Sequence, residues 1–112
     1  MRIPLASVML ALLTATAPAA AKPVHPCASQ AAQQALKLLK FQSDEDDRAE
    51  VFKDRVKSIG TIKALRGNGR FDVIEVPGAI YKTDYRMRLI YAQIPGQCVL
   101  MGQEVLEESD PY

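Results

Sequence analysis

The residues of this 112-residue chain that could bind or react are mostly basic and lie in its second half. Side chains alternate along a strand, so an extended segment would place Arg86 and Arg88 on one face, with Lys82 in the same row. Guanidinium groups two positions apart can bind carboxylates or phosphates bidentately. The spacing predicts a surface for an anionic polymer or a partner's acidic loop. Three more basic residues lie on the first predicted hairpin: Lys63, Arg66 and Arg70.

The alternative is that these basic residues pair with acids inside the domain. Asp72, Glu75 and Glu104 lie in neighbouring predicted strands, where cross-strand ion pairs form. Without Arg2, the only charged residue of the predicted signal peptide, the chain has 13 basic and 13 acidic residues. This balance favours internal pairing. It also argues against nucleic acid as a partner, because neutralising several phosphates requires a basic excess.

Catalytic groups are sparse in this sequence. The only histidine, His25, lies in a proline-bounded lead-in outside any predicted helix or strand. A general base has to be held within about 3 Å of its target, which a flexible tail does not do. The serines have no evident base partner, and no acid shows the burial that raises a carboxyl pKa. We therefore expect no catalytic residue and a protein that is not an enzyme.

Metal and cofactor sites are not expected either. Residues 43–47 carry the carboxylates of a calcium loop but lack its glycine at the sixth position and its glutamate at the twelfth. His25 and Cys27 are close enough to share a metal. A disulfide would consume Cys27, however, and Pro23 removes an amide that a copper site at the chain start would use.

The first 21 residues have the parts of a cleavable signal peptide. Arg2 supplies positive charge, Ile3–Ala15 is a mostly apolar run, and small residues follow up to Ala21. Pro4 and Thr14 shorten the apolar run well below the roughly 20 residues that span a membrane. We expect cleavage near Ala21, no transmembrane anchor, and a mature chain that is periplasmic or secreted.

Cys27 and Cys98 are the only cysteines of the chain. Because an exported compartment is oxidising, a disulfide between them is the default prediction. A closed loop of about 70 residues stabilises a fold by roughly 4 kcal/mol on the chain-entropy model. That is comparable to the whole net stability of a domain this small. Two unpaired or intermolecular thiols are the alternative.

The segment after the signal peptide begins with an extended lead-in over 22–26, because its two prolines cannot start a helix. Apolar residues at three- and four-residue spacing then predict an amphipathic helix over 27–40. A serine followed by four acids is typical of a helix start, and it predicts a short second helix over 43–53.

After Val56 the chain is rich in β-branched and aromatic residues, which predicts four strands. The short separators contain Gly, Pro or Asn, and short turns join antiparallel neighbours into a meander. The predicted strands are Val56–Leu65, Phe71–Val76, Ile80–Ile94 and Cys98–Glu107, and the predicted separators are 66–70, 77–78 and 95–97.

Alternation assigns faces to these strands. In the third, one face should cover the helix, and its residues are Tyr85, Met87, Leu89 and Tyr91. The last strand carries apolar residues on both faces, which predicts a second covering layer or a dimer interface. Val99, Met101 and Val105 share one of its faces, and Cys98, Leu100 and Leu106 share the other. Gly60 and Gly102 interrupt strand interiors and predict bulges or places where the helix backbone comes close.

The sequence therefore predicts the α+β class, with one or two N-terminal helices packed on a four-stranded antiparallel meander. We expect a single domain over 27–108 and a C-terminal tail over 109–112. The order of a helix and then a meander is similar in outline to cystatin-like folds. No cystatin inhibitory motif is present, and fold alone does not imply function.

The stretch YRMRLIYAQIPGQCVLMGQEVLE (Tyr85–Glu107), with DVIEVPGAIYK before it, resembles a group of small exported proteins of proteobacteria. That group has no assigned activity, so the resemblance implies export and a bacterial origin without adding a site. We expect a small periplasmic binding or inhibitory module whose partner is another envelope protein. The alternatives are a self-associating structural envelope protein and a small enzyme.

Overall fold

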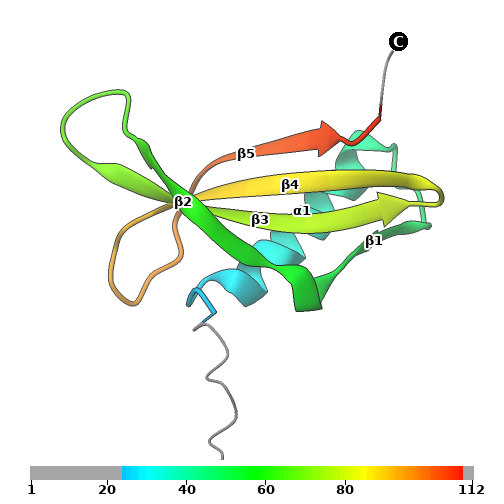
Figure 1. Ribbon diagram of the computed structural model, residues 1–112, viewed down its shortest axis with the longest axis horizontal. Helices are drawn as coiled ribbons and strands as arrows, with labels where there is room; N and C mark the ends of the chain where they lie inside the picture. The colour runs from blue at the N-terminus through cyan, green and yellow to red at the C-terminus, as the bar shows by residue number, and fades with distance from the viewer. Residues whose placement is uncertain (1–23, 110–112) are drawn as a thin grey trace, which may run out of the picture.

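The computed structural model describes residues 24–109 and contains one helix packed on one face of an antiparallel sheet (Figure 1). The predicted α+β class is confirmed. The predicted signal peptide, the start of the lead-in and the last three residues of the tail lie outside the described residues. Over 24–109, no helix has the length and apolarity needed to cross a membrane.

Helix α1 (Ala28–Gln42) is the predicted amphipathic helix. Its stripe of Ala31, Ala35 and Leu39 is completely buried against the sheet. The alanines allow close approach of the two layers, and Leu39 supplies most of the buried volume. At the C-terminal end, the Ser43 hydroxyl donates to the Leu39 carbonyl oxygen at 2.8 Å. Ser43 therefore ends α1 and does not begin a new helix.

The prediction of a second helix over 43–53 is wrong. Asp44 and Glu45 adopt φ angles of 59° and 62°, in the left-handed region that a right-handed helix cannot contain. A short strand, β1 (Ala49–Val51), and a single 3₁₀ turn, η1 (Lys53–Arg55), follow. The acidic run thus forms a turn that redirects the chain from the helix to the edge of the sheet.

Four further strands complete an antiparallel sheet: β2 (Lys57–Lys63), β3 (Arg70–Ile80), β4 (Thr83–Ala92) and β5 (Leu100–Glu107). β1 and β2 both pair with β3, at 78–80 and 70–75 respectively, and β4 and β5 follow in order on its other side. β1 and β2 therefore act as one interrupted edge strand. The predicted meander is present, with its first strand displaced toward the chain start and broken in two.

Pro77 and Gly78 lie inside β3, although the sequence predicted a turn there. The Pro77 carbonyl accepts a hydrogen bond from the Phe52 N–H at 2.9 Å, at the break between β1 and β2. The backbone N and O of one strand residue point toward the same neighbouring strand. The nitrogen of Pro77 therefore also faces this break, where no strand partner needs an N–H. At Gly78, an added Cβ would lie 2.6 Å from the Glu50 carbonyl oxygen and 2.8 Å from Met87 Cε. Glycine is required there for packing.

The hairpin turn that sequence placed at 77–78 occurs at Tyr81 and Lys82, between the paired residues Ile80 and Thr83. Tyr81 adopts a φ of 54°, the left-handed conformation found in two-residue hairpin loops. Neither Tyr nor Lys is a typical turn residue. β3 consequently runs to Ile80 and forms a long hairpin with β4.

The core lies between α1 and what we call the inner face of the sheet. Its fully buried residues from the two central strands are Ile74 and Val76 of β3 and Met87 and Leu89 of β4, with Tyr91 almost as buried. The predicted inward-facing set of β4 is confirmed, with Tyr85 partly buried at its margin. We call the opposite side the outer face.

β5 contains a bulge that changes which of its residues face the core. Its register against β4 shifts between Ile90 and Tyr91, so Met101 is an extra residue and is 53 % exposed. One extra residue reverses the alternation that follows. Leu100 and Val105 consequently both pack against the core. The prediction that β5 carries apolar residues on two faces in strict alternation is therefore wrong.

Candidate functional site

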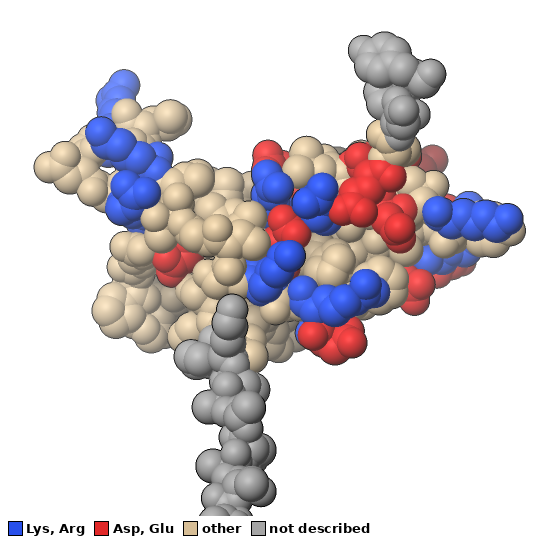
Figure 2. Space-filling view, in the orientation of Figure 1, with Lys and Arg blue, Asp and Glu red and all other residues tan. Residues whose placement is uncertain are grey.

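The outer face of the sheet has no helix over it within residues 24–109 (Figure 1). Figure 2 shows this face, with basic and acidic side chains interleaved over β4 and β5 and a separate basic group at the end where β2 meets β3. Apolar side chains fill the space between these two charged areas. The outer face thus combines an ordered set of charges with an apolar surface.

The ordered charges form a row across four strands. The register aligns Lys57, Glu75, Arg88 and Glu104 side by side. Arg88 Nε donates to Glu75 Oε2 at 3.3 Å, and Lys57 Nζ lies 3.8 Å from Glu75 Oε1. Arg88 also reaches Glu104 at 3.5 Å. We call these four residues the charged row. Its signs alternate, which stabilises neighbouring strands.

Glu75 is the centre of the charged row and is only 4 % exposed. A carboxylate taken out of water is stable only when it is paired and hydrogen-bonded. Arg88, on the neighbouring strand, satisfies this requirement and is itself held in one orientation by doing so. The guanidinium is therefore preorganised on an otherwise open surface.

The other two predicted binding residues have different surroundings. Arg86 forms an ion pair with Glu108, although its buried Nε lacks the alignment of a hydrogen bond. Lys82 lies in the turn between β3 and β4, with its ammonium 5.4 Å from the centre of the Tyr81 ring. The structure brings Arg86 and Arg88 to one face and leaves Lys82 at the hairpin end. Both arginines are paired internally: Arg88 pairs with acids named in the sequence-based alternative, whereas Arg86 pairs with Glu108, which was not among them.

A bulge in β2 shapes the apolar part of the outer face. The register against β3 shifts between Ser58 and Gly60, and Gly60 has a φ of 129° that favours glycine. Ile59 is the extra residue of this bulge. The bulges predicted from the two strand glycines are thus both present. Ile59 and Ile62 are each 42 % exposed.

Beside the charged row lies an apolar hollow of about 310 Å³. Arg88 and Glu104 of the charged row form its rim. Its apolar lining comes from β2, β3 and β4, namely Ile59, Ile62, Val73 and Ile90. This hollow is called the apolar hollow below.

A second hollow of about 370 Å³ lies on the other side of the charged row, and it is lined by equal numbers of basic and acidic residues. Arg55, Lys57 and Arg86 face Glu75, Asp84 and Glu108 there.

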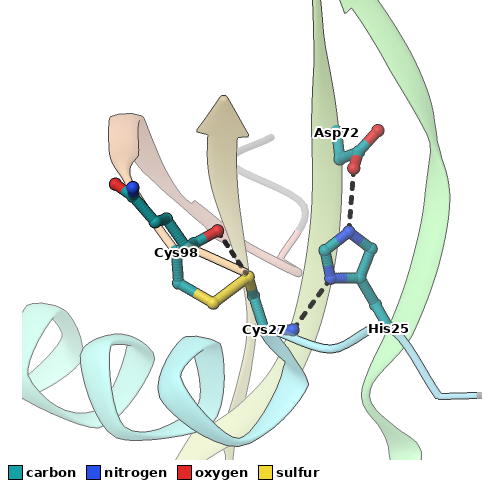
Figure 3. The surroundings of a disulfide bond; sticks show 5 residues. His25, Cys27, Asp72 and Cys98 are labelled. Atoms are coloured by element: carbon teal, nitrogen blue, oxygen red, sulfur yellow. Dashed lines mark hydrogen bonds and ion pairs between the residues drawn. A yellow bond between two sulfur atoms is a disulfide. The ribbon is translucent and has the colours of Figure 1, made fainter. Parts of the chain in front are cut away.

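His25 is anchored to the sheet, which corrects the expectation that it lies in a flexible tail (Figure 3). Its Nδ1 accepts a hydrogen bond from the Cys27 backbone N–H at 3.0 Å, so its Nε2 carries the proton and donates to Asp72 Oδ2 at 2.8 Å. Gln93 donates to the other Asp72 oxygen at 2.8 Å. Both ring nitrogens are occupied, and the imidazole fixes the lead-in to β3.

Two carboxylates have lowered pKa values. Hydrogen bonds from Gln93 and His25 hold the pKa of Asp72 below its ordinary value of 3.8. A side-chain hydrogen bond from Arg48 lowers the pKa of the half-buried Asp46 to about 2. Each carboxylate is thus engaged in its ionised form. Neither is suited to donate a proton near neutral pH.

The predicted disulfide joins Cys27, at the start of α1, to Cys98, just before β5 (Figure 3). The bridged Cα atoms are 5.7 Å apart, and the pair closes a separation of 71 residues. An open depression of about 610 Å³ adjoins it, lined by His25, Asp72 and the 92–98 segment. His25 and Gln93 both donate to Asp72 there, so the imidazole and the carboxylate of the depression are already engaged with each other.

Over residues 24–109, no three His, Cys, Asp or Glu side chains gather as metal ligands. No family model, curated protein or solved structure matches this chain.

Proposed function

We propose that this chain is a small exported binding module, without catalytic activity, that docks a partner protein of the cell envelope on the outer face of its sheet. The observation that carries the proposal is the apolar hollow beside the charged row. Protein interfaces combine an apolar centre with a polar rim in this way. This docking surface differs from the basic surface that the sequence suggested. Arg88 lies on the rim of the proposed site, and Ile59 and Ile62 form its centre.

The dimensions of the apolar hollow suit an inserted side chain. A volume of about 310 Å³ accommodates a large apolar residue of a partner, such as Leu or Phe. Arg88 and Glu104 on the rim are already held by the charged row, so little side-chain entropy is lost when a partner's polar groups meet them. The site is thus suited to a neutral partner segment with an apolar anchor.

Export of the chain rests on its sequence and its disulfide. The first 21 residues have the signal-peptide pattern, and Cys27 and Cys98 are bonded as expected in an oxidising compartment. The resemblance of residues 85–107 to small exported proteobacterial proteins points the same way. These features support a partner in the periplasm or at the envelope.

Self-association is the weaker candidate. Self-association was suggested by a last strand with two apolar faces. In the structure, however, the bulge at Met101 turns Leu100 and Val105 toward the same core. The outward-facing residues of β5 include Glu104, and a charged edge strand opposes pairing with a second copy. A binding module for another protein therefore fits better.

Affinity capture from envelope extract tests the proposal. We compare the wild-type chain with the Ile59→Asp, Ile62→Asp double variant, which places two charges in the apolar hollow. Phe41→Asp is the matched control, because Phe41 is 80 % exposed at the end of α1, away from the outer face. We expect one partner, identified by mass spectrometry, that the double variant loses and the control retains.

A partner kept by the double variant would rule out the apolar hollow as the docking site. Recovery of further copies of this chain alone, with sedimentation showing a dimer at micromolar concentration, would favour the self-associating protein instead. Circular dichroism of each variant must match the wild type, since a lost fold would also lose a partner.

A further inference from the structure

We propose that residues 61–70, the end of β2, the loop and the start of β3, bind the surface of a bilayer that contains anionic phospholipid. We call these residues the hairpin tip. They lie at one end of the molecule, apart from α1 (Figure 1). This inference is separate from the docking proposal, because Lys63, Leu65, Arg66 and Arg70, which carry it, do not line the apolar hollow.

The hairpin tip is basic and lacks acidic residues. Its sequence TIKALRGNGR contains Lys63, Arg66 and Arg70 and no Asp or Glu. Among residues 24–109, no ion pair involves any of these three side chains, and Arg70 Nε instead donates to the Thr61 hydroxyl at 2.8 Å. Figure 2 shows this basic group set apart from the interleaved charges. The charge is therefore available to an external anion.

Cross-strand pairing in the hairpin tip is electrostatically unfavourable. Lys63 lies directly opposite Arg70, and like charges in that position destabilise a hairpin. A few residues farther along the same two strands, Lys57 lies opposite Glu75, as expected for a structural pair. Local conflicts of this kind occur at functional sites. Lipid phosphates would neutralise both cations and remove the repulsion.

Leu65 favours a bilayer over a water-soluble polyanion. Its side chain is fully exposed, at 104 % relative exposure, between Lys63 and Arg66. An acidic protein loop or polysaccharide would neutralise the cations but leave this leucine in water. At a membrane, the basic residues meet the phosphates while the leucine enters the boundary between headgroups and acyl chains. Both properties of the hairpin tip are then used.

The expected membrane binding is weak, and the free-energy contributions of the individual residues add. Each basic residue near an anionic surface strengthens partition about fivefold, so three residues contribute about 100-fold. Burial of the leucine side chain adds about tenfold. Because the charges are exposed, partition should fall steeply as ionic strength rises.

Tryptophan fluorescence provides a direct test, since the chain contains no Trp. Leu65→Trp introduces a single reporter in the hairpin tip, and Phe41→Trp is the control at another exposed apolar site. Each purified chain is titrated with vesicles of phosphatidylcholine alone or with about 30 % phosphatidylglycerol. We expect a blue shift for Trp at position 65 with the anionic vesicles only, reversed by salt. The control should not shift.

The charge contribution is measured in the Leu65→Trp background. Changing Lys63, Arg66 and Arg70 to Gln should weaken partition about 100-fold. The matched control changes three exposed or half-exposed lysines elsewhere, Lys37, Lys40 and Lys53, to Gln and should change partition less than about twofold. Thermal unfolding of both triple variants confirms that they fold.

Three results would overturn the proposal. One is equal blue shifts with neutral and anionic vesicles, which would show that the charges are irrelevant. Another is equal weakening by the two triple variants. The third is retention on immobilised heparin without any shift on anionic vesicles, which would assign the hairpin tip to an acidic macromolecule.

Discussion

The inner face of the sheet buries Ile74, Val76 and Met87 completely beneath α1, whereas the outer face leaves Ile59 and Ile62 each 42 % exposed beside paired charges. The buried residues belong to the central strands β3 and β4, whereas Ile59 and Ile62 belong to β2, at the edge of the sheet. The inner face is specialised for packing. The outer face contains a buried, ion-paired carboxylate beside an apolar hollow that is open to solvent, and exposed apolar surface of this kind is typical of binding sites.

The comparison implies that stability and binding are separable in this molecule. Changes on the inner face, and in the disulfide that fixes α1 to it, should lower the free energy of unfolding. Changes at the two exposed isoleucines of the apolar hollow, Ile59 and Ile62, should leave that free energy nearly unchanged.

Removing the disulfide should have the largest effect. Replacing Cys27 and Cys98 with Ser releases a separation of 71 residues, and chain entropy predicts a loss of about 4 kcal/mol in the free energy of unfolding. Urea denaturation of the double variant, against the oxidised wild type, measures this. A loss below about 1 kcal/mol would mean that packing of α1 alone holds the inner face together.

Leucine and isoleucine truncations compare the two faces directly. Leu39→Ala removes a fully buried side chain of the inner face and should cost about 3 kcal/mol. Ile62→Ala in the apolar hollow should cost less than about 0.5 kcal/mol. Chemical denaturation gives both values. Similar costs would show that the outer face is part of the core and would contradict the separation.

Within the charged row, the contribution of Arg88 to stability should come mainly from its pairing with the buried Glu75. Arg88→Gln leaves Glu75, at 4 % exposure, with only the more distant Lys57, and should cost about 2 kcal/mol. Glu104→Gln removes a partner that is about half exposed and should cost less than about 0.5 kcal/mol. Thermal unfolding separates the two variants. Equal costs would mean that Arg88 does not stabilise the buried carboxylate.

The smallest effect should be pH-dependent. The folded-state pKa of Asp72 is lowered by Gln93 and His25 from 3.8, so its stabilising contribution is fully present above about pH 4 and is lost as pH falls through the folded-state pKa. Asp72→Asn should cost about 0.5 kcal/mol at pH 6 and progressively less below pH 4. Unfolding free energies from pH 2 to 7 measure the difference. A cost that grows on acidification would reverse the assigned sign.

Local pattern predicted the inner face well. The spacing of alanines and leucines indicated α1, alternation indicated the inward set of β4, and the two cysteines indicated the disulfide. These features depend on residues close in sequence or on a single possible pairing. Hence α+β architecture followed from the sequence.

Non-local geometry produced the errors. Pro77 was predicted to lie in a turn because proline lacks the N–H that a strand residue normally pairs. In the structure that position faces the break between β1 and β2, so no strand hydrogen bond is lost there. Ser43 looked like a helix start because a serine cap can also end a helix. The bulges at Gly60 and Gly102 were expected, but their consequence for the face of each following residue was not.

The candidate site was predictable only in part. The sequence placed Arg86 and Arg88 on one face and offered internal pairing as an alternative. It did not indicate that Glu75 is buried, because that depends on four strands meeting in one register. The apolar hollow was missed because Ile59 and Ile62 are an odd number of residues apart and share a face only through the bulge.

Site-specific photocrosslinking in living cells tests the docking face most directly. A photoreactive residue is placed at position 62 in the apolar hollow or at position 41 on the end of α1, and crosslinked products are identified by mass spectrometry. We predict one crosslinked envelope protein from position 62 and none from position 41. The same partner from both positions, or from position 41 alone, would contradict binding at the outer face.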